Sequence, residues 1–157
     1  MRGKILIVDD FADWRELLKG ILLREGYHVE SAATLQEARD YIARTKELDL
    51  AILDIRLVET DETNEDGMRL LGEIHEHQTF TKVIMITGHG TMESQRKAFR
   101  AFHAFDFFRK EQFDSEDFRE AVREALEQAA HERRAWKDKS YMQGHHYETW
   151  RREQTES

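Results

Sequence analysis

The sequence predicts one α/β domain in which a parallel sheet lies between two layers of helices. Residues 4–110 alternate short, wholly apolar runs with amphipathic segments at helical spacing. Runs of about four residues rich in Ile, Val and Leu are typical of strands buried on both faces of a parallel sheet. The chain has 157 residues, 39% of them hydrophobic, which is enough for one core. Strand and helix repeated five times predict a three-layer sandwich with right-handed crossovers.

The domain starts with a buried strand at Ile5–Val8 and an amphipathic helix that stops at Gly26, a typical residue after a helix C-terminus. A second strand is expected at Tyr27–Ala32, where mixed polar and apolar residues suit the edge of a sheet. Thr34–Glu37 has the pattern of a capping box and opens the next helix. The apolar stripe of the first helix comprises Trp14, Leu17, Leu18, Ile21 and Leu22, and that of the second comprises Ala38, Tyr41 and Ile42.

Three further strands are predicted at Leu50–Leu53, at Val83–Ile86 and, with aromatic residues, at Phe105–Phe108. A helix is expected after each of them, and Asp114 or Ser115 caps the last one. The apolar stripes of these helices comprise Met68, Leu70, Leu71 and Ile74 for the third, Met92, Gln95, Phe99 and Phe102 for the fourth, and Phe118, Ala121, Val122, Ala125, Leu126 and Ala129 for the fifth.

The fifth helix is predicted to run from Ser115 to Trp136, past the end of the sheet, and to give way to a polar tail with scattered aromatic residues. We therefore divide the chain into a domain over residues 1–130 and a C-terminal extension over residues 131–157. A heptad-like seam along this helix predicts a homodimer, and a solvated helix end is the alternative. The seam comprises Phe118, Val122, Ala125, Ala129, Glu132 and Trp136, with Tyr141, Met142, Tyr147 and Trp150 downstream.

The composition argues against several classes of protein. Basic residues number 24 and acidic residues 32, a net charge of −8 that argues against a free nucleic-acid binder. The chain has no cysteine, so disulfides, thiolate nucleophiles and cysteine-bound zinc are excluded. No apolar run is long enough to span a membrane, and no signal peptide precedes the first strand. We therefore expect a cytoplasmic protein.

Polar side chains follow four of the five predicted strands. Asp9 and Asp10 come after the first strand, Asp54 after the third, Thr87 after the fourth and Lys110 after the fifth. In open sheets of this kind, ligands bind beyond the carboxyl ends of the strands, where these groups are expected to meet. A lone aspartate at such a position is usually a turn or cap residue, whereas the whole set predicts a site.

The residue types at this site predict magnesium and phosphoryl chemistry. Three clustered carboxylates repel one another unless a cation neutralises them. Oxygen ligands without histidine or cysteine favour a hard ion, and Mg²⁺ leaves open positions for phosphoryl oxygens. The Thr87 hydroxyl and the Lys110 ammonium group suit the remaining oxygens of a phosphoryl group.

Four segments resemble the receiver domain of two-component response regulators, namely Lys4–Asp10, Ala51–Asp54, Ile84–Gly90 and Phe105–Lys110. The resemblance covers about residues 3–130. It implies a flavodoxin-like, doubly wound, five-stranded parallel sheet in the order 2-1-3-4-5, with helices on both faces. It also implies a phosphorylation-dependent signalling switch, with no enzymatic activity beyond transfer and loss of its own phosphoryl group.

The resemblance implies a role for each acidic residue of the site. Asp54 is the phosphoacceptor, which attacks a phosphohistidine on a sensor histidine kinase or a phosphotransfer protein. Asp10 binds Mg²⁺ directly and Asp9 binds it mostly through water. Asp54 and the carbonyl oxygen of Arg56, two residues later, complete the protein ligands.

Phosphorylation is expected to change one face of the domain. The resemblance implies that Thr87 and Lys110 hold the phosphoryl oxygens and that Phe107 occupies the position of the switch aromatic. Movement of Thr87 and repacking of Phe107 would alter the face formed by the fourth helix, the fifth strand and the fifth helix. The residues after Trp136 are too few for a DNA-binding domain, so we expect output through a downstream protein or a homodimer, with no nucleic-acid or membrane partner.

Three positions depart from the family pattern. Glu111 replaces the proline after the site lysine, and we expect a trans Lys110–Glu111 bond, because a cis bond before a non-proline residue costs about 3–4 kcal/mol. Leu57–Val58 replaces Met-Pro after the phosphoacceptor. An acidic insertion then occupies Glu59–Asp66, either as a solvated loop or as a partner-recognition element.

Three alternatives stay open at this point. An aspartate-nucleophile phosphohydrolase would place D-x-D after its first strand, where this chain has Asp9 and Asp10 in direct succession. A flavin-binding module would need a hydroxyl-rich phosphate loop there, and the two aspartates would repel the phosphate. A receiver fold that works as an interaction module without phosphorylation would not need the complete set of reactive groups.

Overall fold

The sheet has the predicted order of strands. The computed structural model describes the backbone of residues 3–156 and the side chains of residues 3–139. Five parallel strands form one sheet in the order β2-β1-β3-β4-β5. The strands are β1 (Lys4–Val8), β2 (His28–Ala32), β3 (Leu50–Leu53), β4 (Lys82–Thr87) and β5 (Asp106–Arg109).

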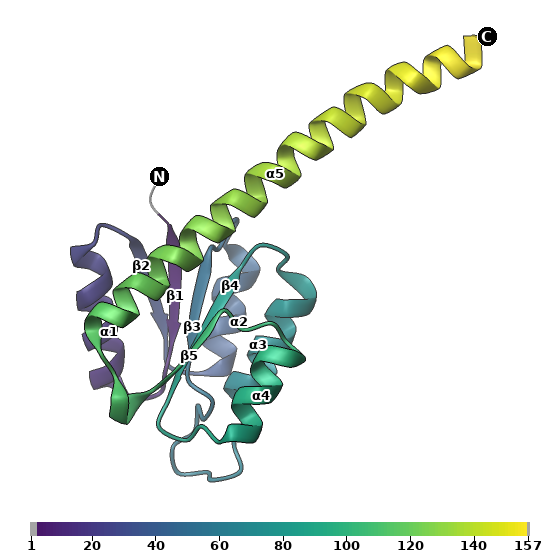
Figure 1. Cartoon of the computed structure of the whole chain (residues 1–157). Coiled ribbons are helices and arrows are strands. Elements are labelled where there is room, and N and C mark those ends of the chain that lie inside the picture. The colour runs from purple at the N-terminus through teal and green to yellow at the C-terminus, as the bar shows by residue number, and fades with distance from the viewer. Residues whose placement is uncertain (1–2, 157) are drawn as a thin grey trace.

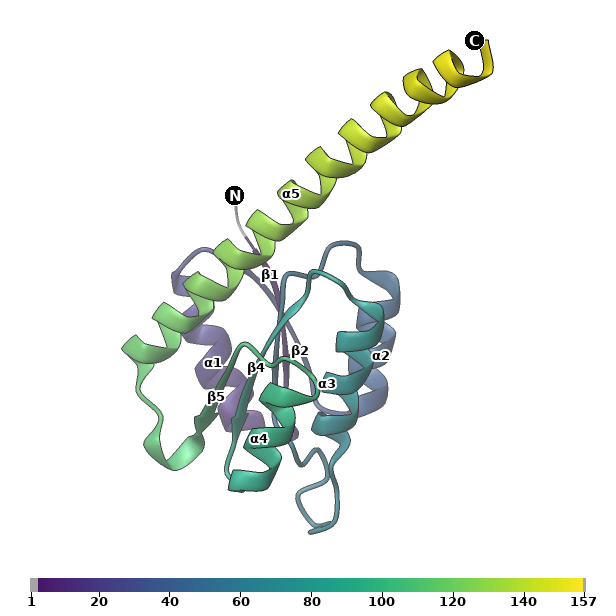
Figure 2. The same ribbon diagram turned by 45° about the vertical axis from the view of Figure 1, so that its right-hand side comes forward.

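The helices lie in two layers on either side of the sheet, as Figure 1 and Figure 2 show. Helices α1 and α5 pack on one face, and α2, α3 and α4 pack on the other. The helices are α1 (Ala12–Arg24), α2 (Leu35–Arg44), α3 (Asp66–His77), α4 (Met92–Arg100) and α5 (Ser115–Glu156), with a short 3₁₀ turn, η1 (Lys110–Gln112), between β5 and α5.

Alternating side chains of the central strands enter the two halves of the core. Leu6 and Leu53 pack toward α2, α3 and α4, whereas Ile7 and Ile52 pack toward α1 and α5. Because successive side chains of a strand point to opposite faces, a strand covered on both faces must be apolar at every position. This explains why the runs at β1, β3 and β4 are wholly apolar.

Local hydrogen bonds fix where the helices begin and end. The Thr34 hydroxyl accepts a hydrogen bond from the Glu37 N–H at 3.1 Å, as predicted, but the Glu37 carboxylate accepts from the N–H of Ala33 rather than from that of Thr34. Asp114, not Ser115, caps α5, because its carboxylate accepts from the N–H groups of the first turn. Gly26 follows α1 with a φ of 86°, a conformation that favours glycine.

Two predicted apolar stripes need correction. Leu17 lies at the side of the buried stripe of α1 and is exposed. In α4 the buried residue is Ala98, whereas Met92 and Gln95 are exposed. Helix α4 is a short helix at the edge of its layer (Figure 1), and its contact with the core is made by Ala98 together with the half-buried Phe99.

Helix α5 is longer than predicted. It runs without interruption from Ser115 to Glu156, a total of 42 residues, so the prediction that the helix ends near Trp136 is wrong. Residues 131–156 contain no proline and a single glycine, and they are rich in Arg, Lys, Glu and Gln, which favour helix. No helix in the described part of the chain, α5 included, has the length and apolar character needed to cross a membrane.

The seam predicted for a dimer is used within the chain itself. Its first four residues, Phe118, Val122, Ala125 and Ala129, are buried in the domain. The two that follow, Glu132 and Trp136, contact Lys82 and Phe80 of the same chain. The first four residues are therefore not available to a second subunit, whereas Trp136 is exposed, and a homodimer through the C-terminal extension stays a prediction. The side chains of Tyr141, Met142, Tyr147 and Trp150 lie outside the described residues.

Polar contacts anchor α5 to the edge of the sheet opposite the predicted site. The Arg133 guanidinium group pairs with the buried carboxylate of Asp49, which also accepts the Lys4 N–H at 2.9 Å. Lys137 Nζ lies 3.3 Å from Glu47 Oε1. The helix therefore packs against the domain as far as Lys137, and Figure 1 shows it projecting beyond.

Candidate functional site

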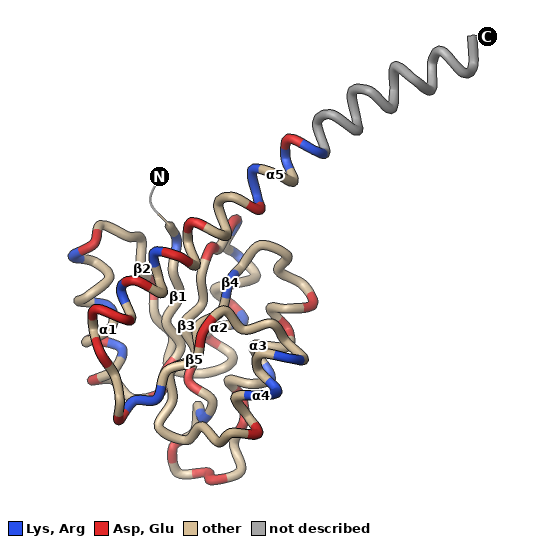
Figure 3. The backbone as a smooth tube through the Cα atoms, viewed as in Figure 1, with Lys and Arg blue, Asp and Glu red and all other residues tan. Residues whose placement is uncertain are grey.

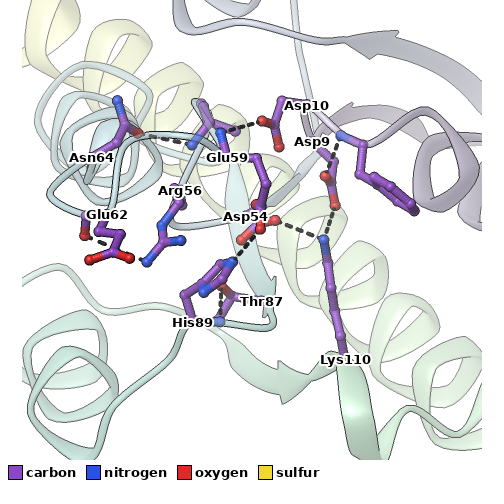
Figure 4. A network of polar contacts seen from close by, with 12 residues as sticks. Asp9, Asp10, Asp54, Arg56, Glu59, Glu62, Asn64, Thr87, His89 and Lys110 are labelled. Carbon is purple, nitrogen blue, oxygen red and sulfur yellow. Dashed lines mark hydrogen bonds and ion pairs between the residues drawn. The ribbon is translucent and has the colours of Figure 1, made fainter.

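The predicted site residues gather at the carboxyl edge of the sheet. Asp9 follows β1 and Asp54 follows β3, and the Asp54 N–H donates to the Val8 carbonyl oxygen at 3.0 Å, so the two strands stay paired up to the site. Thr87 is the last residue of β4. Lys110 is the first residue of η1, directly after β5. Figure 4 shows these side chains converging.

Three carboxylates form the centre of the site. Asp9, Asp10 and Asp54 each place an oxygen so that these atoms lie within 4.8 Å of one another. Asp9 is 2% exposed and Asp54 is 1% exposed. Lys110 Nζ lies 2.8 Å from Asp9 Oδ2 and 2.8 Å from Asp54 Oδ2. One ammonium group thus faces three carboxylates, which leaves the cluster with excess negative charge.

Burial and crowding change the pKa values of two of these groups. Burial, together with the negative charge of Asp54, raises the pKa of Asp9 from 3.8 to about 6, although Lys110 and the N–H of Phe11 act in the opposite direction. For Lys110, burial lowers the pKa, but the hydrogen bonds to Asp54 and Asp9 outweigh it and the pKa is raised. Lys110 is therefore a fixed positive charge at this site.

The free oxygen atoms of the cluster fit a divalent cation. Asp10 Oδ1 and Asp54 Oδ1 are buried and have no hydrogen-bond partner among the described residues. An unpaired buried carboxylate oxygen is unfavourable, and a hard cation with oxygen ligands would remove this cost. The donor set contains carboxylates only, which is the set expected for Mg²⁺ rather than for a softer metal.

Gly67 fixes the backbone of Asp54. A Cβ atom at position 67 would lie 1.6 Å from the carbonyl oxygen of Asp54, so only glycine permits this close approach. The Gly67 N–H also donates to the Ile55 carbonyl oxygen at 2.8 Å. The start of α3 is thus seated directly on the peptide that carries the Asp54 carboxylate.

The hydroxyl and the aromatic residue of the predicted switch lie on neighbouring strands. Thr87 is fully buried, and its hydroxyl accepts the His89 N–H at 3.1 Å. Phe107 on β5 packs against Phe99, with ring centroids 6.5 Å apart. Its ring also lies beside Gly90, where a Cβ atom would come within 2.8 Å. The loop that follows Thr87 therefore runs beside the ring of Phe107.

The acidic insertion is an exposed loop held in shape by its own hydrogen bonds, and its first residue, Glu59, contacts the site. The Asn64 side chain accepts hydrogen bonds from the N–H groups of Leu57 and Asp66 at 2.9 and 3.1 Å. The Arg56 side chain reaches the Glu62 carbonyl oxygen at 3.5 Å. Figure 3 shows the acidic residues of this loop at the end of the domain opposite to the projecting part of α5. The ligand role of the Arg56 carbonyl oxygen stays a prediction.

Sequence reasoning missed two polar residues beside the site. Glu59 donates its N–H to Asp10 Oδ2 at 2.8 Å, and its carboxylate lies 2.9 Å from His89 Nε2. The insertion was visible in the sequence, but nothing in the spacing of residues 59 and 89 indicates that they meet. Trp14, predicted only as a core residue, lies with its ring 5.3 Å from Lys110 Nζ.

The Lys110–Glu111 bond is trans, as predicted, and residues 3–156 contain no cis peptide bond.

Comparison with known proteins gives the family. The model of the response regulator receiver domain matches residues 5–123. Response regulator protein PilR of Pseudomonas aeruginosa is 38% identical over 125 residues, which are 80% of this chain and 26% of PilR. Sporulation initiation phosphotransferase F of Bacillus subtilis is 30% identical over 126 residues, which are 80% of this chain and 95% of that protein. A crystal structure of a CheY-like receiver domain protein from Methanospirillum hungatei is 32% identical, with a TM-score of 0.74, and the match covers 84% of this chain and 99% of that one.

The chain therefore belongs to the response regulator receiver domain family. The sequence resemblance and the predicted order of strands are both confirmed. The chain spans about a quarter of the length of PilR. What such longer relatives do as whole proteins therefore does not transfer to this chain.

Proposed function

We propose that this receiver domain accepts a phosphoryl group on Asp54 from the phosphohistidine of a sensor histidine kinase or a phosphotransfer protein, and that it acts as a signalling switch. The observation that supports this most is the state of the Asp54 carboxylate. One of its oxygens is paired with Lys110, and the other is buried without a partner among the described residues. A carboxylate held in this way is positioned for attack on phosphorus.

The transfer needs positioning and charge neutralisation rather than an elaborate set of catalytic groups. The Asp54 oxygen forms a bond to phosphorus, the phosphorus–nitrogen bond of the donor breaks, and the donor imidazole leaves. Lys110 stabilises the negative charge on the phosphoryl oxygens. Mg²⁺, held by Asp10, Asp54 and the Arg56 carbonyl oxygen and through water by Asp9, would supply the remaining positive charge. The phosphoryl group is transferred to the Asp54 of the domain itself, and no external molecule is phosphorylated and released.

The switch uses the neighbouring strands. The Thr87 hydroxyl turns toward a phosphoryl oxygen, and the loop that covers Phe107 moves with it. Gly90 in this loop contacts the Phe107 ring, so the ring repacks when the loop moves. The face formed by α4, β5 and α5 changes as a result and becomes the surface for a downstream protein or for a second subunit.

We keep the division into a receiver domain over residues 1–130 and an extension over residues 131–157 as a proposal, with one refinement. Because contacts from Glu132 to Lys137 tie α5 to the domain, the unit that folds as one extends to Lys137.

Intact-mass measurement after incubation with acetyl phosphate and Mg²⁺ tests the proposal. The wild-type chain should gain the mass of one phosphoryl group, and Asp54→Asn should gain none. Asp61→Asn is the matched control, because it removes a carboxylate from the insertion and should label like wild type. Labelling of Asp54→Asn, or no labelling of the wild-type chain, would contradict the proposed function.

A further inference from the structure

A polar bridge joins the two loops that flank Asp54. Glu59 lies in the loop after β3, and His89 lies in the loop after β4. Glu59 Oε1 and His89 Nε2 are 2.9 Å apart, and Figure 4 shows the pair beside the Asp54 carboxylate. A neutral imidazole that carries its proton on Nε2 can donate this hydrogen bond. The contact therefore does not depend on a charged histidine.

Each end of the bridge is also attached to a residue of the site. The Glu59 N–H donates to Asp10 Oδ2 at 2.8 Å, and the His89 N–H donates to Thr87 Oγ1 at 3.1 Å. Asp10, Glu59, His89 and Thr87 are therefore linked in one chain of hydrogen bonds. This chain connects the metal-binding side of the site with the hydroxyl expected to meet the phosphoryl group.

We propose that Glu59 and His89 form a latch that closes the site in the unphosphorylated protein and opens when Asp54 is phosphorylated. The proposal rests on the proposed function. Two changes on phosphorylation work against the latch. The Thr87 hydroxyl gives up the His89 N–H when it turns to a phosphoryl oxygen, and the added negative charge repels the Glu59 carboxylate.

The strength of the contact suits a latch. The Glu59 side chain is 54% exposed and the His89 side chain is 31% exposed. Pairs with this exposure contribute little to stability, so the latch opens easily. The loop that carries Glu59 is held more firmly than this contact, because the Asn64 side chain accepts two backbone N–H groups and keeps the insertion folded. Opening therefore frees the acidic insertion, Glu59–Asp66, as a unit that a partner can bind.

The rate of labelling by acetyl phosphate with saturating Mg²⁺ tests the latch. Glu59→Ala and His89→Ala should each be labelled about two- to five-fold faster than wild type, the range given by about 0.4–1 kcal/mol for an exposed pair. Both variants retain the backbone N–H groups that contact Asp10 and Thr87. Glu62→Ala is the matched control, since it removes the same charge from the same loop outside the bridge, and it should change the rate much less.

The double variant separates a latch from two independent effects. If Glu59 and His89 act as one unit, E59A/H89A should be labelled no faster than either single variant. Amide hydrogen exchange of residues 59 and 89, whose N–H groups donate to Asp10 and Thr87, is the second readout. Phosphorylation should increase it in the wild-type chain, whereas Glu59→Ala should show the increased exchange before phosphorylation.

The outcomes distinguish the latch from the function on which it rests. If Glu59→Ala and Glu62→Ala are labelled at the same rate, or if the two single effects multiply in the double variant, the latch is wrong while phosphorylation of Asp54 stands. If no variant and no wild-type chain is labelled, the proposed function fails and the latch fails with it.

Discussion

Asp9 is expected to destabilise the fold at neutral pH when no metal is bound. It is almost fully buried, and burial is the largest cause of its raised pKa, followed by the charge of Asp54. Lys110 compensates for this only in part, because it is shared with Asp54. Replacing Asp9 with Asn removes the charge and keeps the shape, so Asp9→Asn should stabilise the metal-free protein above pH 7.

The magnitude follows from the pKa. A rise from 3.8 in the unfolded chain to about 6 in the fold corresponds to about 3 kcal/mol. The folded state binds the Asp9 proton more tightly, so this free energy is lost as the pH rises from about 4 to about 6 and is fully lost at pH 8. The Asn side chain gives up one hydrogen bond from Lys110, worth about 1 kcal/mol, so the net gain expected at pH 8 is about 1–2 kcal/mol.

Urea denaturation in the presence of EDTA measures the effect. Asp9→Asn should exceed the wild type in free energy of unfolding at pH 8, and the difference should vanish or change sign near pH 4. Asp40→Asn, at an exposed position on α2, is the control and should show little change at either pH. A variant that is less stable than wild type at pH 8 would refute the reasoning, because the ion pair with Lys110 would then outweigh burial. Saturating Mg²⁺ should stabilise the wild type more than Asp9→Asn.

Two further predictions concern the backbone of the site and the anchor of α5. Gly67→Ala should lower the free energy of unfolding by about 3 kcal/mol or more and slow the labelling of Asp54, because the new Cβ would meet the Asp54 carbonyl oxygen. Gly20→Ala, in α1 with no neighbour near its Cβ, should stabilise by about 0.5–1 kcal/mol, and an equal loss in both variants would contradict this account. A chain ended after Ala130 should be about 3 kcal/mol less stable than one ended after Lys137, because the ion pairs of α5 lie between these ends and one buries a carboxylate. If the two chains have the same free energy of unfolding in urea, the domain boundary lies at residue 130, as predicted from the sequence.

The sequence predicts the sheet well because burial on both faces leaves a local signal. A run such as Leu50–Leu53 must be apolar at every position, and its limits agree with those of β3. The site could be predicted for a related reason. Parallel strands bring their carboxyl ends to one edge, so the residues directly after the apolar runs, Asp9 and Asp54 among them, had to meet.

Contacts between distant residues leave no such signal. Arg133 and Asp49 are 84 residues apart, and the pairing of two charged side chains at this separation follows from the packing of α5 and not from any spacing. The same holds for Glu59 and His89, which are 30 residues apart. The length of α5 could not be read from apolar periodicity, because its last part has no core to face and depends on helix propensity instead.

The distribution of buried residues also indicates which helix next to the site is held least firmly. Helix α3 buries five residues, Gly67 among them, whereas α4 buries Ala98 alone. An element with few buried contacts opens at a low free energy, so α4 is the least firmly held helix next to the site. Its first residue, Met92, lies five residues after Thr87, and the loop between them contacts the Phe107 ring at Gly90. A hydrogen bond donated by the Thr87 hydroxyl to a phosphoryl oxygen on Asp54 would contribute on the order of 1–3 kcal/mol, which is enough to shift a weakly packed helix but not α3.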